Sequence, residues 1–107
     1  MQYIQIQITF PTAESADKMA EKLVQERLVA CAQVCGTVKS IYIWEGVCAT
    51  STETLLLAKT TLELFAHAES VIRKEHPYEC PQIVALPLIA ANADYLDWLR
   101  EQLCRPL

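Results

Sequence analysis

The first ten residues alternate apolar and polar side chains, which is the pattern of a β-strand with one dry face. The apolar positions are Ile4, Ile6, Ile8 and Phe10. After Pro11, apolar side chains recur every three or four residues as far as Leu28, as they do on one face of a helix. The chain therefore opens with a strand followed by a helix, for which Thr12 is the expected cap.

A long hairpin is expected next. Residues 29–60 contain two strand-like runs, and the small polar residues 46–52 between them suit a turn. Gly36 is expected to kink the first of these strands. Tyr42 and Trp44 share one face of it, and this pair fits a subunit interface, where aromatic residues are enriched, better than a surface that stacks on nucleic-acid bases.

The rest of the chain repeats the helix and strand order. Thr60 or Thr61 caps a second helix, which must stop by His76 because the proline after it disfavours helical geometry. Residues 83–90 predict a fourth strand. Asn92 is the expected cap of a short last helix that runs to residue 103.

The resulting order is βαββαβ with an added C-terminal helix, in a single domain over residues 1–107. It predicts an α+β, ferredoxin-like fold, in which one antiparallel sheet carries two helices on one face. Pro87 cannot donate a ladder hydrogen bond, which places its strand at an edge or at a bulge. Apolar residues make up 52% of the chain, and the strands are too apolar for the second sheet face to lie in water. We expect another subunit to cover that face.

Charge and composition exclude several classes of function. The net charge is −4 and the basic residues are scattered, so no nucleic-acid footprint exists. No run approaches the roughly 20 apolar residues of a membrane span. The two glycines form no phosphate-binding loop. We expect a cytoplasmic protein with no membrane partner and no enzymatic activity. Its five cysteines, an odd number, predict buried free thiols rather than a disulfide framework.

Residues 75–82, EHPYECPQ, contain one of the two histidines, a cysteine and two prolines. The prolines fix two φ angles, so the segment is a stiff corner between helix and strand. His76, Glu79 and Cys80 are metal-ligand types that favour copper or zinc. The alternative is structural: His76 ends the helix and bonds a carbonyl or a carboxylate.

Two interpretations are also open for Lys59. It either pairs with an anionic ligand or extends from the edge of the core to water.

Several segments together resemble the CutA family of divalent-cation tolerance proteins, over essentially the whole chain. They are ERLVACAQV, G-x-V-x-S-x-Y-x-W-E-G from Gly36, E-x-LLLAKTT from Glu53, HPYECPQIVALPL, and N-x-x-YLDWL from Asn92. The resemblance implies a tight homotrimer in which long hairpins extend the sheets between subunits, as in the trimeric PII signalling proteins. It implies inter-subunit clefts near Tyr42, Trp44, Lys59, His76, Tyr78, Tyr95 and Trp98. It also implies tolerance to copper and other divalent cations, with copper bound by some members and no catalytic activity established.

The chain departs from the family pattern at positions that matter for copper. Ile8 stands where some bacterial members have a cysteine, and Glu75 stands where some have a second histidine. The predicted metal site is therefore His76, assisted by Glu75 or Cys80 or by a neighbouring subunit. The function predicted from the sequence is a trimeric protein that binds or responds to copper or another divalent ion. The alternatives are a PII-like sensor of a small anionic ligand in an inter-subunit cleft, or a structural trimer that positions another protein.

Overall fold

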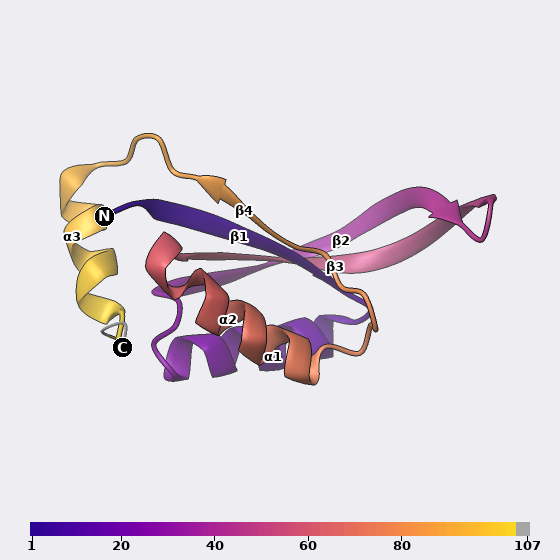
Figure 1. The fold of residues 1–107 in the computed structure, drawn as a ribbon, viewed down its shortest axis with the longest axis horizontal. Coiled ribbons are helices and arrows are strands. Elements are labelled where there is room, and N and C mark those ends of the chain that lie inside the picture. The colour runs from indigo at the N-terminus through magenta and orange to yellow at the C-terminus, as the bar shows by residue number, and fades with distance from the viewer. Residues whose placement is uncertain (105–107) are drawn as a thin grey trace.

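The structure is a computed structural model that describes residues 1–104 (Figure 1). Residues 105–107, which the predicted domain includes, lie outside the described part. The elements follow the predicted order: β1 (Tyr3–Phe10), α1 (Ala13–Gln25), β2 (Cys31–Trp44), β3 (Val47–Thr61), α2 (Leu62–Glu75), β4 (Ile83–Pro87) and α3 (Ala93–Gln102). None of the helices in residues 1–104 is long and apolar enough to cross a membrane.

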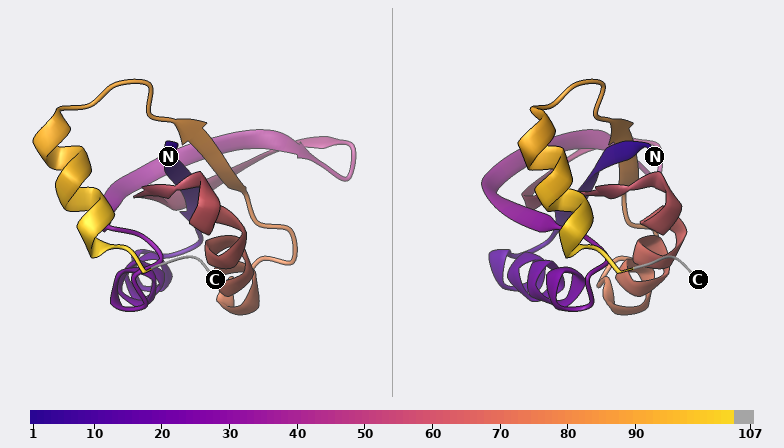
Figure 2. Two further views of the ribbon diagram at one scale, coloured as in Figure 1. Left: turned by 60° about the vertical axis from the view of Figure 1, so that its left-hand side comes forward. Right: turned by 90° about the vertical axis from the view of Figure 1, so that its left-hand side faces the viewer.

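One four-stranded sheet organises the molecule. Its strand order is β2-β3-β1-β4, and each neighbouring pair is antiparallel. The helices α1 and α2 lie side by side on one face of the sheet, and α3 stands at one end (Figure 2). This arrangement confirms the predicted α+β class. It also places β4 at an edge, as Pro87 required, although β4 ends at Pro87 and not at residue 90.

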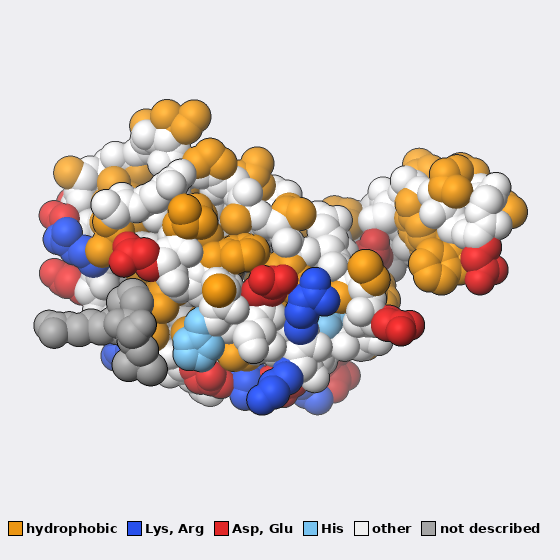
Figure 3. All heavy atoms as spheres, in the orientation of Figure 1, with side chains coloured by type: hydrophobic (Ala, Val, Ile, Leu, Met, Phe, Trp, Pro, Cys, Tyr) orange, Lys and Arg blue, Asp and Glu red, His pale blue; other side chains and the backbone are white. Residues whose placement is uncertain are grey.

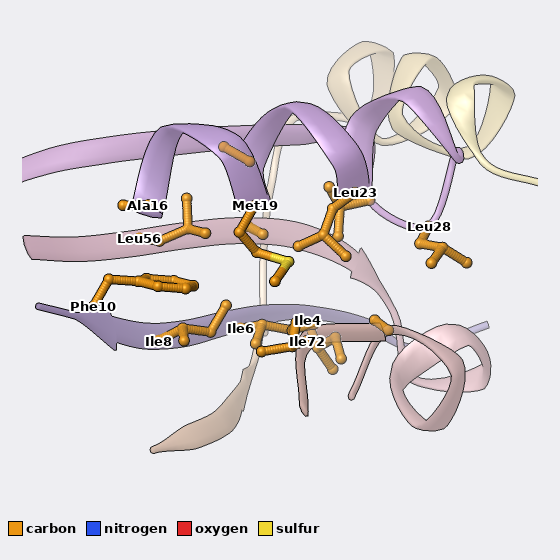
Figure 4. Packing of buried hydrophobic residues seen from close by; sticks show 14 residues of the cluster. Ile4, Ile6, Ile8, Phe10, Ala16, Met19, Leu23, Leu28, Leu56 and Ile72 are labelled. Carbon is orange, nitrogen blue, oxygen red and sulfur yellow. The ribbon is translucent and has the colours of Figure 1, made fainter. Parts of the chain in front are cut away.

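The core lies between the sheet and the two helices. The alternating apolar side chains of β1 point toward α1 and meet its apolar stripe (Figure 4). The buried side chains shown there include Ile4, Ile6, Ile8, Phe10, Met19, Leu23, Leu56 and Ile72. The period-2 pattern of β1 and the period-3.6 pattern of α1 therefore meet in one cluster. Full burial of each large apolar side chain there contributes roughly 1.5–3 kcal/mol to stability.

The start of α1 and both ends of α2 match the prediction, but α1 ends at Gln25, so Leu28 lies beyond the helix that its spacing predicted. The Thr12 side chain accepts a hydrogen bond from the Ser15 amide at 3.1 Å, which caps α1. Thr61 occupies the N-cap position of α2, and His76 is its C-cap. Leu62, the first residue of α2, is apolar but 51% exposed.

The predicted turn over residues 46–52 is wrong. The structure turns only at Glu45 and Gly46, whose φ angles are 50° and 80°. Two successive residues with positive φ match the twist of the flanking strands, and pairing with β2 then draws the polar residues from Val47 onward into β3. The predicted kink is confirmed by a register shift between Cys35 and Thr37.

The expectation of buried thiols is also wrong. All five cysteines are free, but Cys48 and Cys80 are exposed, and Cys31, Cys35 and Cys104 are half-buried. Cys48 lies on the projecting hairpin and Cys80 lies in a surface corner, so neither reaches the core between the sheet and the helices.

Candidate functional site

The β2–β3 hairpin leaves the body of the molecule at one defined point. The last residue of β1, Phe10, pairs with Thr54, so from Glu53 outward β3 pairs only with β2. The bulge of β2 lies at the same level, where Thr37 pairs with Thr54. We call this junction the hairpin root. Beyond it the hairpin projects alone (Figure 1).

His76 is buried beside the hairpin root. The proline that follows ends α2, and the His76 backbone N–H closes the last turn on the Ile72 carbonyl at 2.9 Å. The ring is stacked on Phe10, with 4.5 Å between ring centroids, and the residue is 8% exposed. A 2.8 Å hydrogen bond joins His76 Nε2 to the carbonyl of Thr9, which lies 67 residues earlier in the chain.

The hydrogen bonds of this ring fix its tautomer. The Tyr78 backbone N–H donates to His76 Nδ1 at 3.0 Å, so Nδ1 is the unprotonated nitrogen. Nε2 therefore carries the proton and donates to the Thr9 carbonyl, which can only accept. Burial lowers the pKa of His76 below its ordinary value of 6.5, and the Thr9 bond and the charge of Glu53 oppose that effect. The neutral ring is the form that the fold holds.

Glu53 is the functional candidate that sequence reasoning missed as a site residue. Its side chain is 8% exposed, and its Oε2 accepts a hydrogen bond from Tyr78 Oη at 2.9 Å. Burial, and then this bond, raise the pKa of Tyr78 to about 12, so the hydroxyl stays a donor at neutral pH. The sequence did contain a signal, because Glu53 begins the apolar segment ETLLLAKT. A carboxylate buried at such a position requires a hydrogen-bond or charge partner.

The predicted metal set of His76, Glu75 and Cys80 is not assembled within one chain. Glu75 is half exposed, and its Oε2 lies 3.4 Å from Lys22 Nζ on α1, while Cys80 is exposed. Both ring nitrogens of His76 are engaged, so a metal ion at Nδ1 would have to replace the Tyr78 N–H. No group of three His, Cys, Asp or Glu side chains within residues 1–104 could hold a metal ion.

The predicted cleft residues occupy three separate places. Tyr78 lies at the hairpin root, and the charge of Tyr42 is close enough to affect it. Trp44 ends β2 at the tip of the hairpin and is 65% exposed. Lys59, Tyr95 and Trp98 lie at the opposite end of the sheet, in or next to α3. Within one chain these residues line no common cleft, and a cavity of about 380 Å³ between α2 and α3 contains none of them.

The cluster beside α3 is polar on a half-buried surface. Lys59 Nζ donates to Gln33 Oε1 at 2.9 Å, and Lys59 pairs across the strands with Cys31. The Cys31 thiol and the Tyr95 hydroxyl are 3.3 Å apart, and the Tyr95 and Trp98 rings are 5.6 Å apart. Burial, and then the hydrogen bond to Cys31, raise the pKa of Tyr95 to about 12.

Large apolar side chains lie exposed along the hairpin (Figure 3). Ile41 is 64% exposed and Ile43 is 69% exposed, which is unusual for side chains of this size. Val84 and Leu86 of the edge strand β4 are also exposed. Exposed apolar side chains that gather on one element, as on the hairpin, indicate a protein interface.

Comparison with known proteins identifies the family. Residues 4–102 match the family described as CutA1 divalent ion tolerance protein. The divalent-cation tolerance protein CutA of Thermus thermophilus is 46% identical over 94 residues, which are 88% of this chain and 91% of that protein. A solved structure of the divalent cation tolerance protein from Thermus thermophilus superposes with a TM-score of 0.92 at 42% identity, covering 95% of this chain and 99% of that one. CutA1 from Oryza sativa superposes with a TM-score of 0.94 at 31% identity, covering 97% of this chain and 95% of that one. The chain therefore belongs to the CutA1 divalent ion tolerance family.

Proposed function

We propose that this protein acts in divalent-cation tolerance as a homotrimer that binds its ligand between subunits. The observation that carries the proposal is the separation of the candidate residues into groups at the hairpin root, the hairpin tip and the α3 end. In a single chain these groups do not meet, and the apolar side chains of the hairpin stay exposed. Packing against further copies would cover that surface and bring groups from different subunits together. The family membership supports the cation role.

The assembly is tested by the mass of the purified protein in solution. Light scattering after size exclusion is expected to give three chains for the wild type. Ile43→Glu places a charge in the apolar hairpin surface and is expected to give a smaller species. Val24→Glu is the matched control, because Val24 is also an exposed apolar residue but lies on α1. A monomeric wild type at micromolar concentration would contradict the trimer.

We propose copper as the first ion to test, with ligands drawn from more than one subunit. Imidazole and thiolate ligands favour copper, and His76 and the exposed Cys80 come from the same corner. Calorimetric titration with copper is expected to show binding by the wild type and by His67→Ala, and weaker binding by His76→Ala. His67 is the other histidine and lies exposed on α2. Equal binding by all three proteins would exclude His76 as a ligand.

A second candidate is a sensor of a small anionic ligand, and Lys59 is the observation that favours it. Its hydrogen-bond partner among residues 1–104 is a neutral amide, whereas Lys18 and Lys22 pair with carboxylates. An ammonium group whose partner is a neutral amide, on a half-buried sheet face, is available for an anion. A thermal-shift screen of phosphate and carboxylate metabolites would support this role if stabilisation disappears in Lys59→Ala. A screen without any shift would remove it.

We propose a binding role rather than an enzymatic one, in the cytoplasm. His76 uses both ring nitrogens in bonds within the fold, so it offers no free base for proton transfer. A solved relative from Archaeoglobus fulgidus is described as periplasmic, and cell fractionation distinguishes the two compartments. Cell fractionation that finds the protein outside the cytoplasm would correct this part of the proposal.

A further inference from the structure

We propose that Lys59 and the glutamine side chains around it form a binding site for a small monocarboxylate, which a neighbouring subunit completes. The inference rests on the proposed anion-binding role of Lys59 and names the class of anion. The site lies on the sheet face that α1 and α2 leave free. Its polar members are Lys59 of β3, Gln33 of β2, and Gln5 and Gln7 of β1. We call these four residues the amide patch.

The alternation of the strands places the amide patch on the face away from the helices. On β3, Leu56 and Ala58 belong to the core, so Lys59 points to the opposite face, because successive side chains of a strand alternate. The isoleucines of β1 point toward α1 (Figure 4). Gln5 and Gln7, which lie between those isoleucines, therefore point to the same free face as Lys59.

The strand register brings the members of the patch next to one another. Gln5 lies directly opposite Lys59 on one side, and Cys31 lies opposite Lys59 on the other. Gln7 and Gln33 belong to the next row, and Lys59 Nζ donates to Gln33 Oε1 at 2.9 Å. From the spacing of strands and residues, the patch spans about 10 Å by 7 Å. This is the extent of a small molecule.

The glutamines supply hydrogen-bonding groups that the described chain does not use. Gln5 and Gln7 are half-buried, and neither side chain has a hydrogen-bond partner among residues 1–104. Each amide offers two N–H donors and a carbonyl acceptor. Gln33 accepts from Lys59 through its carbonyl oxygen, so its NH₂ group remains a donor for a ligand. When a neighbouring subunit excludes water from this face, these groups require polar partners. The oxygen atoms of a ligand provide them.

The single ammonium group of the patch limits the charge of the ligand to one. None of the side chains that the register places beside Lys59 is acidic or basic. One carboxylate is compensated by the ammonium, whereas the second charge of a dicarboxylate or a phosphate dianion would be buried without a counter-charge. The Tyr95 hydroxyl, 3.3 Å from the Cys31 thiol, adds a polar group at the border of the patch. The site therefore favours a monocarboxylate with a further polar substituent.

Titration of the purified assembly with simple anions tests the class of ligand. ¹⁵N–¹H spectra at pH 7.5 and constant ionic strength follow the side-chain amides of the three glutamines. Lactate, a monocarboxylate with a hydroxyl group, is expected to shift these signals saturably, and neutral lactamide is expected to leave them unchanged. Malonate and inorganic phosphate should bind at least about tenfold more weakly than lactate. Equal or tighter binding of malonate or phosphate would overturn the monocarboxylate class and leave the anion role of Lys59 standing.

Two substitutions locate the site. Gln5→Glu places a carboxylate directly opposite Lys59, so it should abolish the lactate shifts. Gln25→Glu is the matched control, because it adds the same charge at the exposed end of α1, and it should keep them. Lactate binding that survives Gln5→Glu, or that is lost in Gln25→Glu, would overturn the site.

A second variant and the thermal-shift screen separate this inference from the proposed function. Lys59→Gln removes the charge while keeping a polar side chain, and it should weaken lactate binding at least about tenfold, which covers the case in which Gln5→Glu fails to assemble. Unchanged lactate binding in Lys59→Gln would overturn the site. Glutamine signals that ignore lactate, while a metabolite still stabilises the wild type but not Lys59→Ala, would overturn this inference alone. Absence of both effects would remove the anion role of Lys59 as well.

Discussion

Replacing Tyr78 by phenylalanine removes one oxygen atom and one hydrogen bond at the hairpin root. The lost bond is the 2.9 Å contact from Tyr78 Oη to Glu53 Oε2. Glu53 is only 8% exposed, so water replaces the missing donor poorly. A hydrogen bond to a charged group contributes about 1.5–3 kcal/mol. Because Tyr78 itself is half-buried, we expect the free energy of unfolding to fall by about 2 kcal/mol, near the lower part of that range.

Urea denaturation at one fixed protein concentration measures this loss, because the stability of an assembly depends on concentration. A double-mutant cycle with Glu53→Ala, which removes the acceptor, separates the contribution of the Glu53–Tyr78 bond from the other effects of each change. The coupling free energy is expected to reach about 1 kcal/mol, since residues in one hydrogen bond are not additive. Tyr3→Phe is the matched control. Tyr3 is a half-buried tyrosine on β1, and its hydroxyl has no hydrogen-bond partner among residues 1–104.

Either of two results would refute a stabilising role for the Glu53–Tyr78 bond. The first is a loss for Tyr78→Phe that lies within about 0.5 kcal/mol of the Tyr3→Phe value, the range of ordinary surface changes. The second is a cycle in which the effects of Tyr78→Phe and Glu53→Ala on the free energy of unfolding simply add. In both cases the hairpin root would owe its stability to other contacts.

Three other predictions address the turn, the core and the pH dependence. Gly46→Ala should lower the free energy of unfolding by about 1 kcal/mol in urea denaturation, because φ is +80° there, and an unchanged value would contradict the turn geometry. Thr60→Val should cost about 1–3 kcal/mol in the same assay, because it removes a fully buried 2.7 Å bond to the Leu28 carbonyl. The folded pKa of His76 is lowered, so the unfolded chain binds more protons as the pH falls below 6.5. In urea denaturation, the free energy of unfolding of the wild type should therefore decrease as the pH falls from 6.5 to the lower pKa of the folded state. His76→Gln should lack this decrease, and equal pH dependence in both proteins would contradict the lowered pKa.

The local patterns of the chain predicted most of the fold. The alternation of β1 and the apolar spacing of α1 depend only on which side chains lie on one side of a strand or helix. Pro77 stopped α2 at Glu75 because a proline restricts the residue before it. Pro87 marked an edge strand because it lacks a backbone donor. Each of these effects acts within a few residues, so the sequence displays it directly.

The candidate site could be predicted only in part. The sequence identified the corner of residues 75–82 and the importance of His76, and it left the metal and structural interpretations open. The structure shows His76 ending α2 and bonding the Thr9 carbonyl, and within residues 1–104 it forms no metal-binding group of His76, Glu75 and Cys80. Glu53 was absent from the predicted site, because nothing near it in the chain indicates that Tyr78 will reach its carboxylate.

The sequence by itself determined the order of the elements, the face of β1 that is buried and the stiffness of the corner after α2. Tertiary structure alone decided where the hairpin becomes free of the sheet, which nitrogen of His76 carries the proton and which carboxylate is buried. The physical reason is the range of the interactions. Backbone preference and side-chain periodicity act between near neighbours, whereas the bonds from His76 to Thr9 and from Tyr78 to Glu53 join residues 67 and 25 positions apart. Only the folded sheet brings those groups within hydrogen-bonding distance.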